Sequence, residues 1–90
     1  METMDRNTVK RRDCYAVHHG DYVGQMFIVC EVTDVEVGCL SVPDMKNVKV
    51  PTENWTIGRN SDIIERVEKT PKDVFKVCSA QYNKNENANN

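Results

Sequence analysis

The sequence predicts a mainly β fold class, with five short antiparallel strands followed by one C-terminal α-helix. Three observations support this class. Short runs of branched and aromatic residues alternate with turn residues, successive runs are joined by very short turns, and a helical apolar stripe occurs near the end of the chain. With 90 residues, the chain has room for one small domain with a single core.

The chain begins with a segment that shows no apolar periodicity. Residues 1–12 are therefore expected to form a flexible basic arm, in which Lys10, Arg11 and Arg12 form a cluster of cations. A charged N-terminal sequence of this kind is not a secretory signal, so a cytoplasmic location is expected.

The first strand is expected over residues 14–19, and a loop over residues 20–25 follows it. Gly20 and Gly24 lie in this loop, where the backbone needs conformations that a β-carbon would obstruct. The next strand, over residues 26–33, is the strongest in the chain because it is rich in branched and aromatic residues.

The two faces of that strand differ. Phe27 and Val29 point to one side, and an alternating set of apolar residues points to the other. This second set consists of Met26, Ile28, Cys30 and Val32. Part of the strand is therefore expected to be buried on both sides, and another element must cover Phe27 and Val29.

A tight turn at Thr33 and Asp34 leads into a further strand over residues 35–42, so the two strands are expected to form an antiparallel hairpin. The remaining expected elements of this part are a turn over 43–47, a strand over 48–50, a tight helical turn over 51–55 and a strand over 63–68. The spacing of this last segment also permits a helical turn.

A helix is expected over residues 70–82. Thr70 can cap its start, Pro71 suits the first helical position, and Asp73 falls three residues after the cap. The apolar stripe of this helix consists of Val74, Phe75, Val77, Cys78, Gln81 and Tyr82.

A helix of about twelve residues is marginal alone, so this stripe must pack on another element. The uncovered side of the second strand, with Phe27 and Val29, is its expected site. Residues 83–90 are almost entirely polar and are expected to form a disordered tail.

Charge is unevenly distributed along the chain. The formal net charge is −2, but residues 14–70 alone carry −4 while the two flanking segments are slightly basic. A folded domain that binds phosphates would show the opposite distribution, so nucleic acid is not the favoured partner. The chain also has no apolar run of about 18 residues, which excludes a membrane-spanning helix.

The four cysteines show no C-x-x-C spacing, so neither a zinc site nor a redox motif is indicated. They are expected to be reduced, mostly buried thiols, and no cofactor or metal is expected. His18 and His19 are adjacent, and adjacent strand residues point to opposite faces, so this pair cannot chelate one ion. No nucleophile and base are well placed for catalysis, and no enzyme activity is expected.

The order and spacing of these elements resemble a small SH3-like barrel, in the broad sense that includes KOW and Tudor-type modules. The resemblance covers residues 13–69 and rests on the loop after the first strand, the two hairpins and the helical turn before the last strand. It implies a binding module rather than an enzyme. The chain departs from the KOW pattern because Met26 occupies the glycine position and no Lys or Arg lies between Asp13 and Lys46.

The asparagine-rich end and the absence of an active site also resemble small bacteriophage accessory proteins. This resemblance implies an inhibitor or adaptor that binds one host protein in the host cytoplasm. An acidic barrel would suit a basic host surface. The expected function is therefore non-enzymatic protein binding.

The residues expected to contact a protein partner are exposed apolar or aromatic residues in loops together with nearby carboxylates. They are Tyr22, Met45, Trp55, Glu31, Asp34 and Glu36. For Trp55 the alternative is a plug at the end of the barrel.

Two other functions stay open from the sequence. The first is a KOW-type RNA- or DNA-binding module that uses Lys10, Arg11 and Arg12. The second is a homo-oligomer, in which another copy covers Phe27 and Val29 or an open strand edge.

Overall fold

The computed structural model of the chain describes residues 9–55 and 64–88. The described chain has five strands, a short 3₁₀ turn and one helix. In chain order these are β1 (Cys14–Val17), β2 (Met26–Val32), β3 (Glu36–Val42), β4 (Lys46–Pro51), η2 (Thr52–Asn54), β5 (Ile64–Val67) and α1 (Lys72–Ala88).

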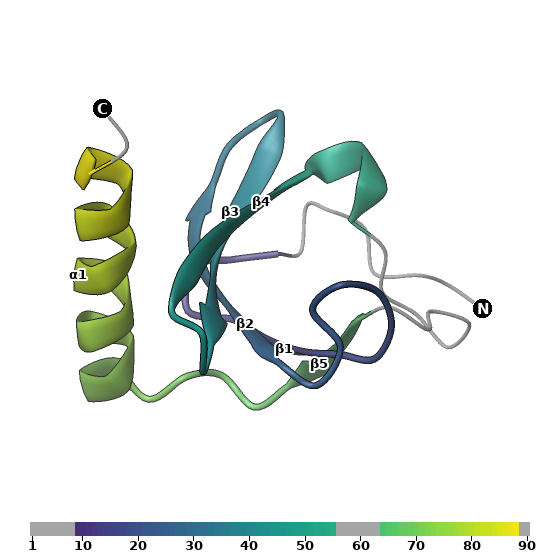
Figure 1. The fold of residues 1–90 in the computed structure, drawn as a ribbon, viewed down its shortest axis with the longest axis horizontal. Coiled ribbons are helices and arrows are strands. Elements are labelled where there is room, and N and C mark those ends of the chain that lie inside the picture. The colour runs from purple at the N-terminus through teal and green to yellow at the C-terminus, as the bar shows by residue number, and fades with distance from the viewer. Residues whose placement is uncertain (1–8, 56–63, 89–90) are drawn as a thin grey trace.

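The strands form one antiparallel sheet with the order β4-β3-β2-β1-β5. The predicted mainly β class, with five antiparallel strands and one C-terminal helix, is confirmed. The sheet is open, because no hydrogen-bonded pairing joins β4 to β5 within the described residues. It is strongly curved, and η2 lies across the opening of the curve while α1 lies outside it (Figure 1). Among the described residues, no helix is both long and apolar enough to cross a lipid bilayer.

The concave side of the sheet encloses the inner cluster of apolar side chains. Strand register places Phe27 beside Tyr15 and Val29 beside Cys39, and these side chains are buried together. The inner cluster consists of Val9, Tyr15, Val17, Phe27, Val29, Val37, Cys39, Trp55 and Ile64. Phe27 and Val29 are therefore covered by the curvature of their own sheet. The prediction that the helix or another copy covers them is wrong.

The convex side of the sheet carries a second, outer cluster, so the sheet divides the expected single core in two. The outer cluster consists of Cys14, Ile28, Cys30, Leu40, Cys78 and Tyr82. Helix α1 contributes its last two members and packs against β2, β3 and β4. Only part of the predicted helical stripe is buried, since Val74 and Val77 are 45% and 64% exposed.

The helix runs to Ala88, so the expected end at residue 82 and the disordered tail are wrong for residues 83–88, while residues 89–90 lie outside the described chain. Polar contacts with the sheet hold this extension. The Asn85 side-chain amide donates to the Met45 carbonyl at 3.1 Å and to Asn47 Oδ1 at 3.0 Å. Asn47 in turn donates to Glu86 Oε2 at 2.8 Å.

The start of α1 also differs from the prediction. The Thr70 hydroxyl is buried and makes no hydrogen bond to the first N–H groups of the helix, so it does not cap α1. Thr70 is instead tied to the N-terminal segment: its N–H donates to the Arg12 carbonyl at 3.0 Å, and its carbonyl accepts from Arg12 Nε at 2.8 Å. These bonds fix the connection between β5 and α1.

The expected flexible arm is wrong for residues 9–12, while residues 1–8 lie outside the described chain. Val9 is only 4% exposed and belongs to the inner cluster. The Arg12 N–H donates to the Val29 carbonyl at 2.8 Å, which extends the pairing of this segment with β2. Residues 9–12 are thus an integral part of the fold.

Candidate functional site

The turn between β2 and β3 is held rigidly by one threonine. The Thr33 hydroxyl accepts hydrogen bonds from the backbone N–H groups of Val35 and Glu36, at 3.3 and 3.0 Å. This side-chain turn fixes Asp34 and Val35 at the tip of the hairpin.

A second element braces the same tip. Thr52, in η2, donates its N–H to the Val35 carbonyl at 3.0 Å and its hydroxyl to the Asp34 carbonyl at 3.2 Å. The side chains of the tip are therefore presented from a backbone that is hydrogen-bonded on both sides. Such a surface loses little conformational entropy when it binds a partner.

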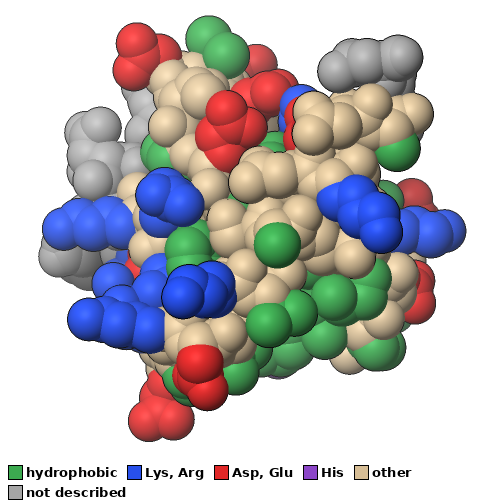
Figure 2. Space-filling model, turned by 90° about the vertical axis from the view of Figure 1, so that its left-hand side faces the viewer, with side chains coloured by type: hydrophobic (Ala, Val, Ile, Leu, Met, Phe, Trp, Pro, Cys, Tyr) green, Lys and Arg blue, Asp and Glu red, His purple; other side chains and the backbone are tan. Residues whose placement is uncertain are grey.

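Carboxylates surround this tip and define what we call the acidic hairpin end. Its members are Glu31, Asp34, Glu36, Glu53 and Glu86, together with the exposed apolar residues Val32 and Val35. Figure 2 shows acidic side chains gathered along the upper edge of the molecule, near the end of α1.

Lys49 is the cation that contacts these carboxylates in the described structure. Its Nζ lies 2.6 Å from Glu86 Oε1 and 3.9 Å from Glu36 Oε2. The Glu86 carboxylate raises the pKa of Lys49, and the Lys49 ammonium and the Asn47 amide lower the pKa of Glu86. Both groups are therefore charged at neutral pH. The five carboxylates and the Lys49 ammonium together carry a formal charge of −4, and the Arg11 guanidinium, which lines a hollow with Glu31 and Glu86, reduces the charge of this end to −3.

Glu31 is fixed differently from the other carboxylates. The Tyr82 hydroxyl of α1 donates to Glu31 Oε1 at 3.1 Å, and burial is the main cause of a raised pKa for this tyrosine. The hydroxyl thus stays protonated and holds the carboxylate against the helix. A shallow hollow of about 440 Å³ lies here, lined in part by Arg11, Glu31, Val32 and Glu86.

The apolar residues of the acidic hairpin end are exposed. Val35 is 72% exposed and Val32 is 37% exposed. A second hollow, of about 400 Å³, is lined by Asp34, Val35, Pro51, Thr52 and Glu53. Exposed apolar side chains rimmed by charged residues are typical of protein-binding surfaces.

The structure brings together three of the six predicted partner-binding residues, Glu31, Asp34 and Glu36. Trp55 lies elsewhere: it is 5% exposed in the inner cluster, with its ring 5.0 Å from that of Tyr15 in an edge-to-face arrangement. The prediction that Trp55 contacts a partner is wrong, and the alternative of a buried plug agrees with its position.

Tyr22 and Met45 also lie away from the acidic hairpin end. Tyr22 is half-buried at the margin of the inner cluster, with its ring 5.5 Å from that of Phe27. Met45 is half-buried beside the outer cluster, under the end of α1. The six predicted residues therefore do not form one surface.

The predicted nucleic-acid residues are largely engaged within the fold. Arg11 donates from Nε to the Cys30 carbonyl at 3.1 Å, and its guanidinium lies 5.3 Å from the centre of the Phe75 ring. Arg12 is bonded to Thr70, as described above. Lys10 remains exposed. The three cations do not extend as a mobile arm.

The cysteines have the character that the sequence predicts. All four are buried free thiols, and burial raises the pKa of Cys30 to about 11. Within residues 9–55 and 64–88, no three metal-ligating side chains form a cluster. His18 pairs with Glu65 at 2.8 Å on the surface.

Comparisons with protein-family models, curated proteins and solved structures found no match to this chain. The expectations of a bacteriophage origin and of a cytoplasmic location stay predictions.

Sequence reasoning missed four members of this surface: Val32, Val35, Glu53 and Glu86. The local sequence indicates that Val35 is exposed, since an apolar residue between Asp34 and Glu36 at a turn has little to pack against. No local sequence feature indicates the position of Glu86, because the polar residues around it predict a disordered tail. Its partners Lys49 and Asn47 lie 37 and 39 positions away in the sequence.

Proposed function

We propose that this protein is a small non-enzymatic protein-binding module, an inhibitor or adaptor that docks its acidic hairpin end on a basic surface of another protein. The observation that carries the proposal is the placement of Val35 and Val32, both exposed, among five carboxylates. Apolar contact would supply affinity, and the charge would supply steering and selectivity for a basic partner.

The rigidity of the surface supports this function. The Thr33 turn and the two bonds from Thr52 hold the hairpin tip in one conformation before binding. The tip therefore needs no ordering step. The basic N-terminal segment gives weaker support to nucleic-acid binding, because Arg11 and Arg12 are bonded to backbone carbonyls.

We also propose that the sheet is an SH3-like barrel. The support is the order of elements: a glycine-framed loop after β1, two tight hairpins, and η2 between β4 and β5. Gly20 and Gly24, which frame this loop, both have positive φ, at 95° and 88°, a conformation that glycine adopts more readily than other residues.

Affinity capture from a bacterial lysate, with and without nuclease treatment, tests the function. The test variant Asp34→Asn/Val35→Ser/Glu53→Gln removes two charges and one apolar contact from exposed positions. The control variant Asp21→Asn/Glu68→Gln removes two charges from exposed positions elsewhere. Thermal unfolding of both variants confirms that each is folded.

We expect the wild type and the control variant to enrich the same basic protein, and the test variant to lose it at least about tenfold, which corresponds to about 1.4 kcal/mol. Equal enrichment by the test variant would contradict the proposal. Recovery of RNA-associated proteins that disappear with nuclease would favour the nucleic-acid alternative instead.

A further inference from the structure

A tight turn over residues 10–13 holds three consecutive cations in a fixed position. The Asp13 N–H donates to the Lys10 carbonyl at 3.1 Å, and the Lys10 N–H donates to Asp13 Oδ2 at 3.0 Å. Arg12 has a positive φ of 82°, which is uncommon for a residue with a side chain. Backbone hydrogen bonds to β2 and from the β5–α1 connection hold it in this conformation. The turn is therefore fixed from both sides.

Both arginines of this turn are anchored through a single nitrogen. Arg11 Nε donates to the Cys30 carbonyl at 3.1 Å, and Arg12 Nε donates to the Thr70 carbonyl at 2.8 Å. Among the described residues, the terminal nitrogens of these two guanidinium groups make no hydrogen bond or ion pair. An anchored guanidinium loses little freedom on binding, and its terminal N–H groups match two oxygens of a phosphate group.

The first turns of α1 add two lysines to the same side of the molecule. Arg11 lies 5.3 Å from the centre of the Phe75 ring and lines a hollow together with Asn83 of the helix. Helical spacing places Lys72 and Lys76 on the same flank of α1 as Asn83. Figure 2 shows Lys and Arg side chains gathered at the left of the view, below the acidic edge.

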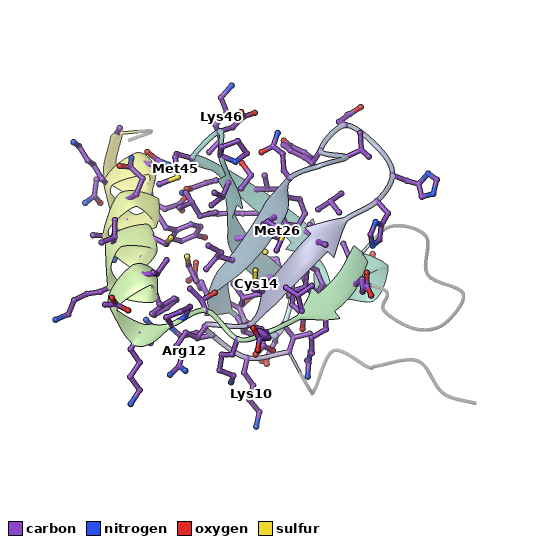
Figure 3. All side chains as sticks on the ribbon, turned by 90° about the horizontal axis from the view of Figure 1, so that it is seen from below. Lys10, Arg12, Cys14, Met26, Met45 and Lys46 are labelled. Carbon is purple, nitrogen blue, oxygen red and sulfur yellow. The ribbon has the colours of Figure 1, made fainter. Side chains whose placement is uncertain are left out.

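We call these five cations the basic flank. Its members are Lys10, Arg11, Arg12, Lys72 and Lys76. All of them except Arg12 are exposed. Figure 3 shows Lys10 and Arg12 on the side of the molecule where α1 begins, and Lys46 on the opposite side.

The chain segments that form the basic flank have a positive net charge. Residues 10–13 and 66–76 contain seven cations and three carboxylates, so their formal charge is +4, or +3 when Arg11 is counted with the acidic hairpin end. One of the three carboxylates, Asp13, is buried and pairs with two of the cations, at 3.2 and 3.4 Å. Folding thus collects positive charge that is divided between two distant parts of the sequence.

The basic flank carries charge without an apolar centre. The exposed apolar residues of α1, Val74 and Val77, lie on the other flank of the helix. Protein-binding and lipid-binding surfaces use apolar or aromatic anchors, whereas a phosphate backbone is bound by cations alone. No Phe, Tyr or Trp side chain among the described residues is exposed, so the bases of a single strand have no platform for stacking.

We infer that the basic flank binds the phosphate backbone of a double-stranded nucleic acid without reading its sequence. The two anchored guanidinium groups contact phosphate oxygens, and Lys72 and Lys76 contact neighbouring phosphates. The inference does not rest on the proposed function, which uses the acidic hairpin end. The phosphates repel the carboxylates of that end and turn it away from the nucleic acid. One chain would then hold a basic protein close to a nucleic acid.

Fluorescence anisotropy of the full chain with a labelled DNA duplex of arbitrary sequence tests the inference. We expect saturable binding at about 50 mM salt. For about four phosphate contacts, the affinity should fall on the order of 100-fold when the salt is raised to about 200 mM. No saturable binding at the lower salt concentration would overturn the inference.

A matched pair of variants locates the surface. Lys72→Gln/Lys76→Gln removes two cations from the basic flank, and we expect it to weaken binding at least about fivefold and to reduce the salt slope by about 2. The control Lys46→Gln/Lys84→Gln has the same net charge and alters exposed lysines outside the basic flank, so its affinity should change less than about twofold. Equal weakening by the two variants would overturn the inference. Circular dichroism of each variant verifies the fold.

Two further probes identify the ligand. Equal binding of labelled polyglutamate would show that the basic flank recognises an acidic protein, and tighter binding of a single strand would show that bases are contacted. Either result would overturn the inference. In a nuclease-treated lysate, Lys72→Gln/Lys76→Gln should still capture the same basic protein as wild type, so the proposed function and this inference fail separately.

Discussion

The two apolar clusters of this protein are built in different ways. The inner cluster is enclosed by the curvature of the sheet and by Trp55, and it needs no helix. The outer cluster depends on α1, whose second half is polar and is held by hydrogen bonds from Asn47, Asn85 and Tyr82. The inner cluster therefore determines whether the chain folds, whereas the outer cluster determines how firmly the helix is attached.

Trp55→Ala tests this comparison with the largest effect. The change leaves a cavity beside Tyr15 in the inner cluster, so we expect a loss of about 3–5 kcal/mol in the free energy of unfolding. Urea unfolding measures it. Val77→Ala, on the exposed side of α1, is the control and should change stability by less than about 0.5 kcal/mol. A small loss at Trp55 would show that the inner cluster does not determine folding.

Gly38→Ala tests the attachment of the helix. A methyl group at this position would overlap the Tyr82 hydroxyl and lie 2.9 Å from Tyr82 Cζ, so it would push α1 away from the sheet. We expect a loss of about 1–3 kcal/mol. In a Tyr82→Leu background Gly38→Ala should reduce the free energy of unfolding by less. A double-mutant cycle from urea unfolding measures the difference. Equal costs in both backgrounds would show that the glycine is not needed for docking the helix.

Alkaline pH acts more gradually, through the buried thiols. Cys30 has a pKa of about 11 in the folded protein, against an ordinary value of 9.0. Between these values the unfolded chain has lost a proton that the folded chain keeps, so stability falls as pH rises.

The slope from this one thiol is at most about 1.4 kcal/mol per pH unit. Urea midpoints measured between about pH 8 and about pH 11 should decrease, and Cys30→Ala should flatten part of the decrease. Midpoints that do not change over this range would show that the thiol is not buried in its neutral form.

Most elements could be predicted from the sequence because their signals are local. Period-2 alternation located the strands, short polar segments located the hairpins, and the helical spacing of Phe75, Cys78 and Tyr82 located α1. The side of the sheet that receives the helix could not be predicted. Both faces of β2 are apolar, and only the curvature of the whole sheet decides that Phe27 turns inward.

The end of the helix and the full acidic surface also depend on distant contacts. Asn85 and Glu86 look like disordered residues until Asn47, 38 and 39 positions earlier in the sequence, provides their partner. Glu31, Asp34 and Glu36 could be placed together because one hairpin carries all three. The exposure of Trp55 could not be predicted, because the same local sequence is compatible with an exposed loop residue and with a buried plug.

Glu86 belongs both to the attachment of the helix and to the acidic hairpin end. Its neighbours in the last turns of α1 are mainly asparagines, which have low intrinsic helix propensity, so these turns depend on contact with the sheet. Fraying of this end would carry Glu86 away and leave the Lys49 ammonium behind. The formal charge of the surface would then become one unit less negative, so local opening of the helix adjusts the electrostatic potential that a basic protein meets.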